Sequence, residues 1–413
     1  MSDTTKYNIN IERSLKWLKS LLVVPDGSMG IYERYRIDRQ AVNHWVRPVC
    51  CMEAARLFMA CGSFIENREY QDIGRRLAAY VMSLQRADGW FAGSFPFYKF
   101  VMVAPDEEDI GSPESSVFAF PNDNGKVAEI LLWFYRQTGE ASYAHAAEAT
   151  LNYFARIQAP DGSFSLNDEG DMPVLKGVDY VAWASNALWY GAVLLNDVKF
   201  RDVGYKAMAW ISQQLTEDWR VKTMYELAGT EGWRPPSSDL AAAVRAYAFA
   251  ARYTQDFAIW NGMSYLAARL MSWQDSGGAI RNCDDSSREA SLQNDPDMTD
   301  MVYTNGYAMM ALQEAYLANG NTNYRDAAER LASFLADVQC WGESGAWDGS
   351  WRGSYHLKRR RWYGRADQDN ELDEGGMYSA YTGLSTATIA YGMLVAMQLR
   401  LPRRPQPVKI GPQ

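Results

Sequence analysis

The feature that most constrains this chain is an alternation of short and long connections between twelve helical segments. Each segment carries apolar residues at i, i+3, i+4 and i+7, which is the spacing of one helix face. The segments are 11–24, 48–61, 70–84, 126–137, 142–157, 180–195, 201–215, 240–253, 260–273, 301–317, 325–338 and 377–399. Short links such as T-G-E-A-S alternate with six long ones. Because antiparallel helices alternate ends, we expect every long link at the same end of the bundle.

A glutamine, a turn and an aromatic residue recur where three of the long links begin. They read L-Q-R-A-D-G-W-F, I-Q-A-P-D-G-S-F and V-Q-C-W-G-E-S-G-A-W. The D-G dipeptides mark turns at which the chain leaves a helix. The pitch from hairpin to hairpin is roughly 60 residues, which is typical of an array of repeated supersecondary units.

Six helical hairpins with all long links at one end resemble the six-hairpin toroid. In that fold six inner helices form a barrel and six outer helices wrap it. The segments that follow long links are rich in small residues, as in A-A-A-V-R-A-Y-A-F-A-A, which suits helices buried all round. We predict an all-α fold, a single (α/α)6 toroid domain over residues 1–413 with 400–413 as a C-terminal tail. The alternative is an open helical solenoid, although solenoid links are usually short.

Composition excludes several classes of protein. The chain is 47% hydrophobic and 13% aromatic, which is too apolar for a disordered protein. Its net charge of −9 argues against a broad nucleic-acid interface, which would need a basic face. The N-terminus lacks an apolar signal region and no segment approaches a membrane span, so we expect a soluble cytoplasmic protein. The five cysteines are an odd number without a C-x-x-C pair, and we expect reduced thiols, with Cys50, Cys51 and Cys61 in the core.

Acidic residues stand at or just before the predicted starts of several inner helices. They are Asp123, Asp179, Asp239, Asp297, Asp300, Asp373 and Glu374. Capping of a helix explains any one of them, since Asp is favoured at helix N-termini. The toroid, however, gathers them at one end of one barrel, where one acid can protonate an oxygen and another can activate water. We therefore expect one or two catalytic carboxylates among Asp123, Asp179, Asp239 and Asp300.

Aromatic residues concentrate in the long links and at the starts of inner helices. Rings with a polar handle suit a wet site that stacks on sugar faces, although large rings also fill gaps between loops. The candidate binding residues of this kind are Trp45, Trp90, Tyr180, Trp183, Trp233, Trp351, Trp362 and Tyr363.

Basic residues cluster in the first and last long links. Arg34, Arg36, Arg39 and Arg47 lie in the first link, and the run 358–361, with Arg360, lies in the last. The two links are neighbours in a closed ring, so we expect the clusters to face each other across the mouth and to hold an anionic group. The alternative is a solvated loop face paired with local acids, which are Glu33, Asp38, Asp367 and Asp369.

Two histidines complete the set of candidates. His44 and His356 lie in the same two long links and join the binding residues, whereas His145 falls on an outer helix. No histidine pair has metal-ligand spacing, and neither a phosphate-binding glycine loop nor a dinucleotide fingerprint is present. We expect neither a metal nor a cofactor.

With its Q-x-x-D-G-x-F turns, acids at inner-helix starts and aromatic links, the chain resembles the six-hairpin glycosidases. It looks most like the unsaturated glucuronyl and rhamnogalacturonyl hydrolases, over almost its whole length. The resemblance implies a glycoside hydrolase in which a carboxylate at the mouth acts as general acid/base on a terminal unsaturated uronic acid. By position it points to Asp123, Asp179 and Asp300. The partner expected is an acidic, uronic-acid-containing oligosaccharide.

Three alternatives stay open. A polysaccharide lyase or uronyl epimerase on the same fold would use Asn43, His44, Tyr180 or Tyr363 to neutralise a uronate and move a proton. The stretch R-L-A-A-Y-V-M-S-L-Q-R-A-D-G-W resembles the glutamine–tryptophan repeat of triterpene cyclases, but D-Q-D-N is the nearest string to their acidic motif. A toroid that binds a saccharide without catalysis is the third.

Overall fold

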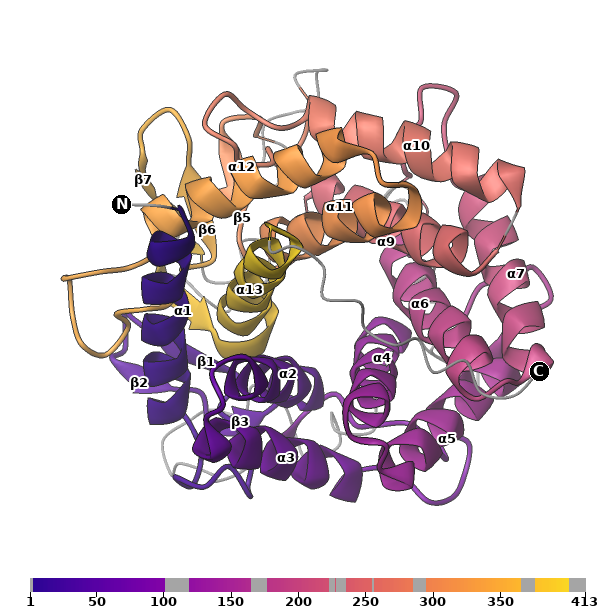
Figure 1. The fold of residues 1–413 in the computed structure, drawn as a ribbon, viewed down its shortest axis with the longest axis horizontal. Coiled ribbons are helices and arrows are strands. Elements are labelled where there is room, and N and C mark those ends of the chain that lie inside the picture. The colour runs from indigo at the N-terminus through magenta and orange to yellow at the C-terminus, as the bar shows by residue number, and fades with distance from the viewer. Residues whose placement is uncertain are drawn as a thin grey trace.

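The helices form two concentric rings (Figure 1). The computed structural model describes residues 3–100, 119–164, 177–222, 227, 235–254, 256–284, 295–364 and 376–400. The outer ring consists of α1 (Asp3–Ser20), α3 (Arg68–Ser83), α5 (Ala141–Ile157), α7 (Val198–Gln213), α10 (Phe257–Ser272) and α12 (Thr322–Val338). The inner ring consists of α2 (Pro48–Phe64), α4 (Pro121–Thr138), α6 (Val178–Leu194), α9 (Pro236–Tyr253), α11 (Asn305–Asn319) and α13 (Thr388–Arg400).

The inner ring is closed. Going round it, α2 contacts α4, and the contacts continue through α6, α9 and α11 to α13, which returns to α2. Each inner helix also packs on one outer helix, and α1 at the start of the chain covers α13 at its end. The predicted toroid is confirmed, and the open solenoid is wrong because α13 meets α2.

Burial separates the two kinds of helix. Every residue of α9 from 236 to 251 is buried, which its run of alanines permits because small side chains let neighbouring helices approach on all sides. In α3, by contrast, the buried residues are one stripe that includes Ile73, Leu77 and Val81. Proline occupies the first turn of α2, α4 and α9, where its missing N–H has no helical partner to lose.

The repeated glutamines clamp neighbouring outer helices together. Each side-chain amide donates to a backbone carbonyl of the next outer helix: Gln85 to Ala146 (2.8 Å), Gln158 to Val203 (3.0 Å), Gln274 to Ala327 (2.9 Å) and Gln339 to Asn10 (3.0 Å). Gln274, in W-Q-D-S-G-G-A-I, is a fourth copy that the sequence pattern missed. The Gln339 clamp joins α12 to α1 and so closes the outer ring. The repeat is therefore architectural and lends no support to cyclase chemistry.

Two three-stranded sheets and one two-stranded sheet lie in the long links, and the sequence did not predict them. One has the order β2-β1-β8, formed by β1 (Arg34–Arg36), β2 (Ala41–Val42) and β8 (Ser379–Tyr381). The other has the order β5-β6-β7, formed by β5 (Met298–Asp300), β6 (Ser354–His356) and β7 (Arg361–Trp362). A two-stranded pair joins β3 (Trp45–Val46) to β4 (Lys99–Phe100). In both three-stranded sheets a hairpin from one link pairs with a strand from the neighbouring link of the ring: β1–β2 pairs with β8, and β6–β7 pairs with β5.

These sheets correct two helix boundaries. The predicted segments 301–317 and 377–399 begin too early: α11 starts at Asn305, and a 3-10 turn (Gly376–Tyr378), β8 and a π-helical turn (Thr382–Ala387) precede α13. Ser379 and Tyr381 instead take extended backbone because their partners in β1 are Arg36 and Arg34. The pairing across the ring overrides the helical periodicity of this segment.

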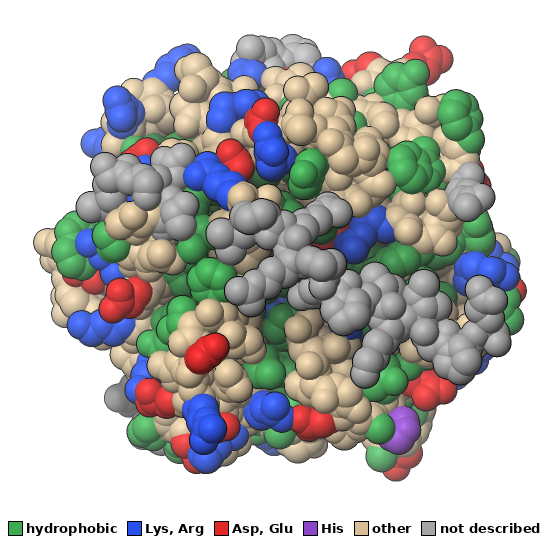
Figure 2. All heavy atoms as spheres, viewed as in Figure 1, with side chains coloured by type: hydrophobic (Ala, Val, Ile, Leu, Met, Phe, Trp, Pro, Cys, Tyr) green, Lys and Arg blue, Asp and Glu red, His purple; other side chains and the backbone are tan. Residues whose placement is uncertain are grey.

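One contiguous apolar core runs from Tyr7 of α1 to Met397 of α13. All five cysteines are free and buried, as expected for Cys50, Cys51 and Cys61. Arg400 still belongs to α13, and the rest of the predicted tail lies outside the described residues. Within the described part of the chain, no helix has the length and hydropathy that a bilayer crossing requires. On the face shown in Figure 2, charges of both signs are interspersed, unlike the broad basic surface of a nucleic-acid binder.

Candidate active site

Three of the four predicted aspartates stand in the first turns of adjacent inner helices. Asp123 belongs to α4, Asp179 to α6 and Asp239 to α9, and their exposed fractions are 6%, 4% and 3%. We call this end of the inner ring, where all its helices begin, the mouth. The alternation of short and long links, read from the sequence, is what brings the three carboxylates to this one end.

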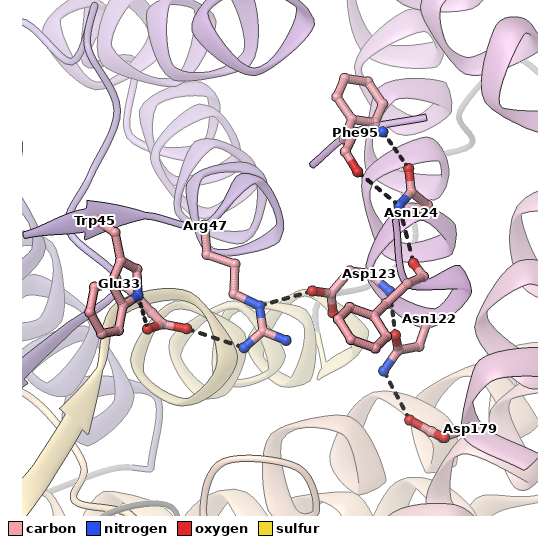
Figure 3. Close-up of polar contacts among 9 residues, drawn as sticks. Glu33, Trp45, Arg47, Phe95, Asn122, Asp123, Asn124 and Asp179 are labelled. Atoms are coloured by element: carbon pink, nitrogen blue, oxygen red, sulfur yellow. Dashed lines mark hydrogen bonds and ion pairs between the residues drawn. The ribbon is translucent and has the colours of Figure 1, made fainter. Parts of the chain in front are cut away.

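An arginine crosses the mouth between two carboxylates (Figure 3). Arg47, the residue before α2, donates from Nε to Asp123 Oδ2 at 2.8 Å and from Nη1 to Glu33 Oε1 at 3.1 Å. Glu33 in turn accepts a 2.5 Å hydrogen bond from Trp45 Nε1. All three charged side chains are buried, so the two carboxylates and the guanidinium offset the cost of each other's desolvation.

The charge of Arg47 is secured by its neighbours. Burial acts to lower the pKa of Arg47, but the carboxylates of Asp123 and Glu33 outweigh burial and raise that pKa well above its ordinary value. The guanidinium face also lies 4.2 Å from the ring centre of Phe97, which adds a cation–π contact.

An asparagine joins Asp123 to Asp179. Asn122 accepts from the backbone N–H of Asp123 at 2.9 Å and donates from Nδ2 to Asp179 Oδ2 at 3.0 Å. Asn124, from the same turn, fixes the preceding link by bonding both the N–H and the carbonyl of Phe95. The N-D-N triplet thus holds two carboxylates in one hydrogen-bonded unit at the mouth.

One carboxylate oxygen of Asp123 lacks a hydrogen-bond donor among the described residues. Oδ1 is buried and accepts no hydrogen bond from any residue that the structure describes. A buried carboxylate oxygen without a donor is costly unless a ligand or water supplies one. An acceptor of this kind beside a second carboxylate can take a proton from, or give one to, a bound hydroxyl group.

Aromatic rings flank this unit. Phe120 stacks on Tyr180 with ring centres 6.1 Å apart, and it meets Phe97 edge-on at 4.7 Å. Trp45 lies against Tyr98 at 5.7 Å. The candidates Trp45 and Tyr180 lie beside this unit, together with the rings of Phe97, Tyr98 and Phe120.

Charges and rings fill the barrel below the mouth. Arg245 of α9 makes two 2.5 Å bonds to Glu129 of α4, and Arg56 of α2 pairs with Glu53. The candidate Trp183 packs edge-on against Tyr307 at 4.7 Å, one helical turn inside Asp179. This paired layer closes the site from below.

The fourth aspartate has a capping role. Asp300, at the end of β5, accepts backbone hydrogen bonds from Tyr303 and Thr304, both at 2.7 Å, and from Val302 at 3.3 Å. These bonds hold the turn into α11. Burial raises the pKa of Asp300 from 3.8 to about 6. Its hydrogen bonds therefore match a structural role in the turn before α11, the alternative to proton transfer.

The basic clusters differ from expectation. The first and last links are neighbours, as predicted, because β1 pairs with β8. Arg36, however, is buried against Asp38 (3.0 Å), and Arg34 donates to the Tyr381 hydroxyl at 2.7 Å. The run 358–361 forms the exposed tip of the β6–β7 hairpin, which pairs through β6 with β5 of the preceding link.

The remaining candidates are spread over the links. Arg39 and Arg360 are exposed at the two hairpin tips, and Trp90 is exposed in the link after α3. His44 is half-buried beside Tyr32, and Trp362 meets Tyr355 edge-on. His356 and Tyr363 are edge-on neighbours at 5.4 Å, and burial lowers the pKa of His356. Trp351 is fully buried and donates to Leu335 of α12, so it packs as a core side chain. Trp233, Asp373, Glu374 and the string D-Q-D-N lie outside the described residues.

Sequence reasoning missed Arg47 and Glu33 as site residues. It placed Arg47 in a basic cluster and Glu33 among solvated acids. The available signal was position, because Arg47 directly precedes an inner helix just as the aspartates do. Among the described residues, no group of three or more His, Cys, Asp or Glu is placed to hold a metal ion.

Comparisons with known proteins agree on the fold. No protein-family model and no curated protein matches the chain. Among solved structures, an alpha-mannanase of Bacteroides thetaiotaomicron is 14% identical, with a TM-score of 0.68 over 97% of this chain and 99% of that one. A cellobiose 2-epimerase from Bacillus thermoamylovorans is 9% identical, with a TM-score of 0.71 over 96% and 99%.

A third similar structure is an unsaturated glucuronyl hydrolase specific for heparin. It is 12% identical, with a TM-score of 0.65 over 95% of this chain and 96% of that chain. Identities this low show a shared fold alone. At that level the resemblance to the six-hairpin toroids is confirmed.

Proposed function

We propose that this protein is a carbohydrate-active enzyme, a glycoside hydrolase that cleaves an oligosaccharide with Asp123 and Asp179 as its acid/base pair. The observation that carries the proposal is the unit Arg47–Asp123–Asn122–Asp179, in which one buried carboxylate oxygen is left open beside a second carboxylate. Glycoside hydrolysis needs two carboxyl groups at one bond, one to protonate the leaving oxygen and one to activate water or attack the sugar.

Two further observations support a saccharide substrate. The rings of Phe97, Phe120 and Tyr180 adjoin the carboxylates, and sugars bind against such faces. Solved structures with this fold include an alpha-mannanase, cellobiose 2-epimerases and a glucuronyl hydrolase, all named for saccharide substrates. Asp239 is the reserve candidate, since it occupies the matching turn of the next inner helix.

The finer part of the proposal is an acidic, uronic-acid-containing substrate. Arg36 and Lys358 are already paired with Asp38 and Asp297, so these two cations are less suited to a substrate carboxylate. Arg34 in β1, with Arg39 and Arg360 at the hairpin tips, are the cations that we propose for that role. A cytoplasmic location likewise remains our proposal, and cell fractionation tests it.

An assay on two matched sets of substrates tests the proposal. The purified protein is incubated with uronic-acid oligosaccharides, saturated and unsaturated, and with neutral manno- and cello-oligosaccharides. Reducing ends, the ultraviolet absorbance of the unsaturated uronyl group and sugar composition are followed together. New reducing ends that are lost in D123N support a hydrolase, and loss of absorbance on the unsaturated set supports the finer proposal. Cleavage of neutral sugars alone would overturn that finer part.

Other outcomes identify the alternatives. A lyase raises the absorbance, and an epimerase changes composition without new reducing ends. Binding without turnover marks a non-catalytic toroid, and a cyclic product from a linear isoprenoid marks a cyclase. Each of these results contradicts the hydrolase.

A further inference from the structure

We propose that Arg47 is a positioning residue, which with Glu33 selects Asp123 as the base or nucleophile of the pair and leaves the proton-donating role to the second carboxylate. This inference rests on the proposed function and assigns roles within it. It concerns residues that do not themselves touch the reacting atoms.

Glu33 and Arg47, which form the ion pair, are both anchored to regular structure. Glu33 is tied to β3 by two bonds to Trp45: its backbone N–H donates to the Trp45 carbonyl at 3.1 Å, and its carboxylate accepts from Trp45 Nε1. The Glu33 carbonyl accepts from the N–H of Thr382 at 2.9 Å, which anchors it to the turn before α13. Arg47 leads directly into α2. The guanidinium therefore has little freedom to follow any movement of Asp123.

The geometry selects one oxygen of Asp123. Nε of Arg47 binds Oδ2 at 2.8 Å, so Oδ2 is held and Oδ1 is the oxygen that still lacks a donor among the described residues. A guanidinium binds the ionised form of a carboxyl group, because it offers donors and a permanent positive charge. An ionised oxygen held in place is what a general base or nucleophile requires.

Asn122 connects Asp123 to the second carboxylate, which belongs to Asp179. Its side chain accepts from the Asp123 backbone and donates to Asp179, so the amide of Asn122 links the two residues. Two neighbouring carboxyl groups with different partners divide the acid and base roles between them. Asp179 is accordingly the candidate for the proton donor.

Glu33 reduces the electrostatic effect of Arg47 on Asp123. Two carboxylates share one guanidinium, so part of its positive charge is offset before it acts on Asp123. Removing the charge of Glu33 therefore leaves more of the Arg47 field for Asp123, whereas removing the charge of Arg47 leaves none. The two substitutions have opposite expected effects on the positive field at Asp123, which a purely structural role would not produce.

The first test is the pH profile of kcat/KM for R47M, R47K and E33Q on a saccharide that the wild type cleaves. We expect R47M to lower kcat by about 100-fold, as for loss of an oriented acid or base, and to move the acidic limb to higher pH. R47K keeps the charge and should return the limb toward wild type. E33Q should move it to lower pH. The matched control is R75M, which also removes an arginine from a carboxylate, but on the exposed outer ring, and should leave the limb in place.

A second readout does not depend on activity. Carbon-13 labelling of the aspartate carboxyls lets the Asp123 resonance be identified by its absence in D123N and titrated in each variant. A titration midpoint that rises in R47M and falls in E33Q supports the positioning of Asp123 by Arg47 and Glu33. Absence of saccharide cleavage would instead refute the hydrolase, and with it the base role of Asp123. Equal midpoints in wild type, R47K and E33Q would overturn the positioning. Since R47K and E33Q are conservative, the comparison holds if R47M does not fold.

Discussion

Arg47 Nε and Asp123 Oδ2 lie 2.8 Å apart and join the starts of two adjacent inner helices, α2 and α4. The two residues are 76 positions apart in the chain and reach each other only because the inner ring places both helix starts at one end. The ion pair is thus a product of the toroid, and it ties the architecture to the chemistry proposed for the mouth.

Ring closure should depend on Gly349. Its φ is +96°, and a Cβ there would overlap the backbone carbonyl of Arg13 in α1. We expect Gly349→Ala to lower the free energy of unfolding by roughly 3 kcal/mol, from left-handed strain and a backbone clash together. Urea unfolding of the purified variant measures it.

The matched control is Gly342→Ala in the same link. Gly342 has a φ of +74° but no atom within 4 Å of an added Cβ. Gly342→Ala should lower the free energy of unfolding only by the left-handed strain, about 1 kcal/mol. Equal losses in the two variants would show that the approach of α1 contributes nothing.

Breaking the buried ion pair Arg245–Glu129 should strongly lower the free energy of unfolding. Arg245 is 2% exposed and bonds Glu129 twice, so R245M would leave the Glu129 carboxylate inside the barrel, with Arg56 at 3.6 Å. We expect a loss of about 3–5 kcal/mol in unfolding free energy. The double variant R245M/E129M should recover part of it, since it removes both charges.

An exposed pair serves as the control for that cycle. Arg75 and Glu140 are more than 40% exposed, and R75M should cost less than about 1 kcal/mol. A loss in R245M as small as that in R75M would contradict a buried charge layer.

Asp300 should make stability depend on pH. Burial raises its pKa to about 6 in the folded state, against 3.8 when unfolded. Between these values the folded protein holds a proton that the unfolded chain has released, so stability falls as pH rises through this interval, by up to about 3 kcal/mol. The amide introduced by D300N cannot titrate. The unfolding free energy of wild type minus that of D300N, measured in urea, should therefore fall steadily from pH 4 to pH 6 and stay level above. A constant difference over that range would contradict the assignment.

Local signals in the sequence predicted the architecture well. Helical periodicity and the alternation of link lengths depend on nearby residues, and they gave the closed double ring. The repeated glutamine was recognised as a repeat, but its partners, such as Asn10 for Gln339, lie in other helices and could not be read from it. The strands of the links were missed because segments of two or three residues carry too little alternation to predict.

The site was predicted in part for the same reason. Asp123 and Asp179 follow from helix starts, which are local. Whether an acid caps its own helix or faces a partner is a tertiary property, so Asp300 and Asp123 were indistinguishable until their donors were seen. Arg47 contacts Glu33 and Asp123 across 14 and 76 residues, and no local pattern distinguishes it from Arg36, which pairs with Asp38 two residues away.

The most direct test of the account is turnover by D123N on the best saccharide substrate, beside D337N as a control. Asp337 is an exposed acid on α12, a helix of the outer ring, where it pairs with Lys6. No catalytic role is proposed for it. The account predicts that D123N loses at least about 100-fold in kcat, as expected for removal of a catalytic acid or base, while its thermal unfolding stays close to that of D337N. Wild-type turnover by a folded D123N would contradict it.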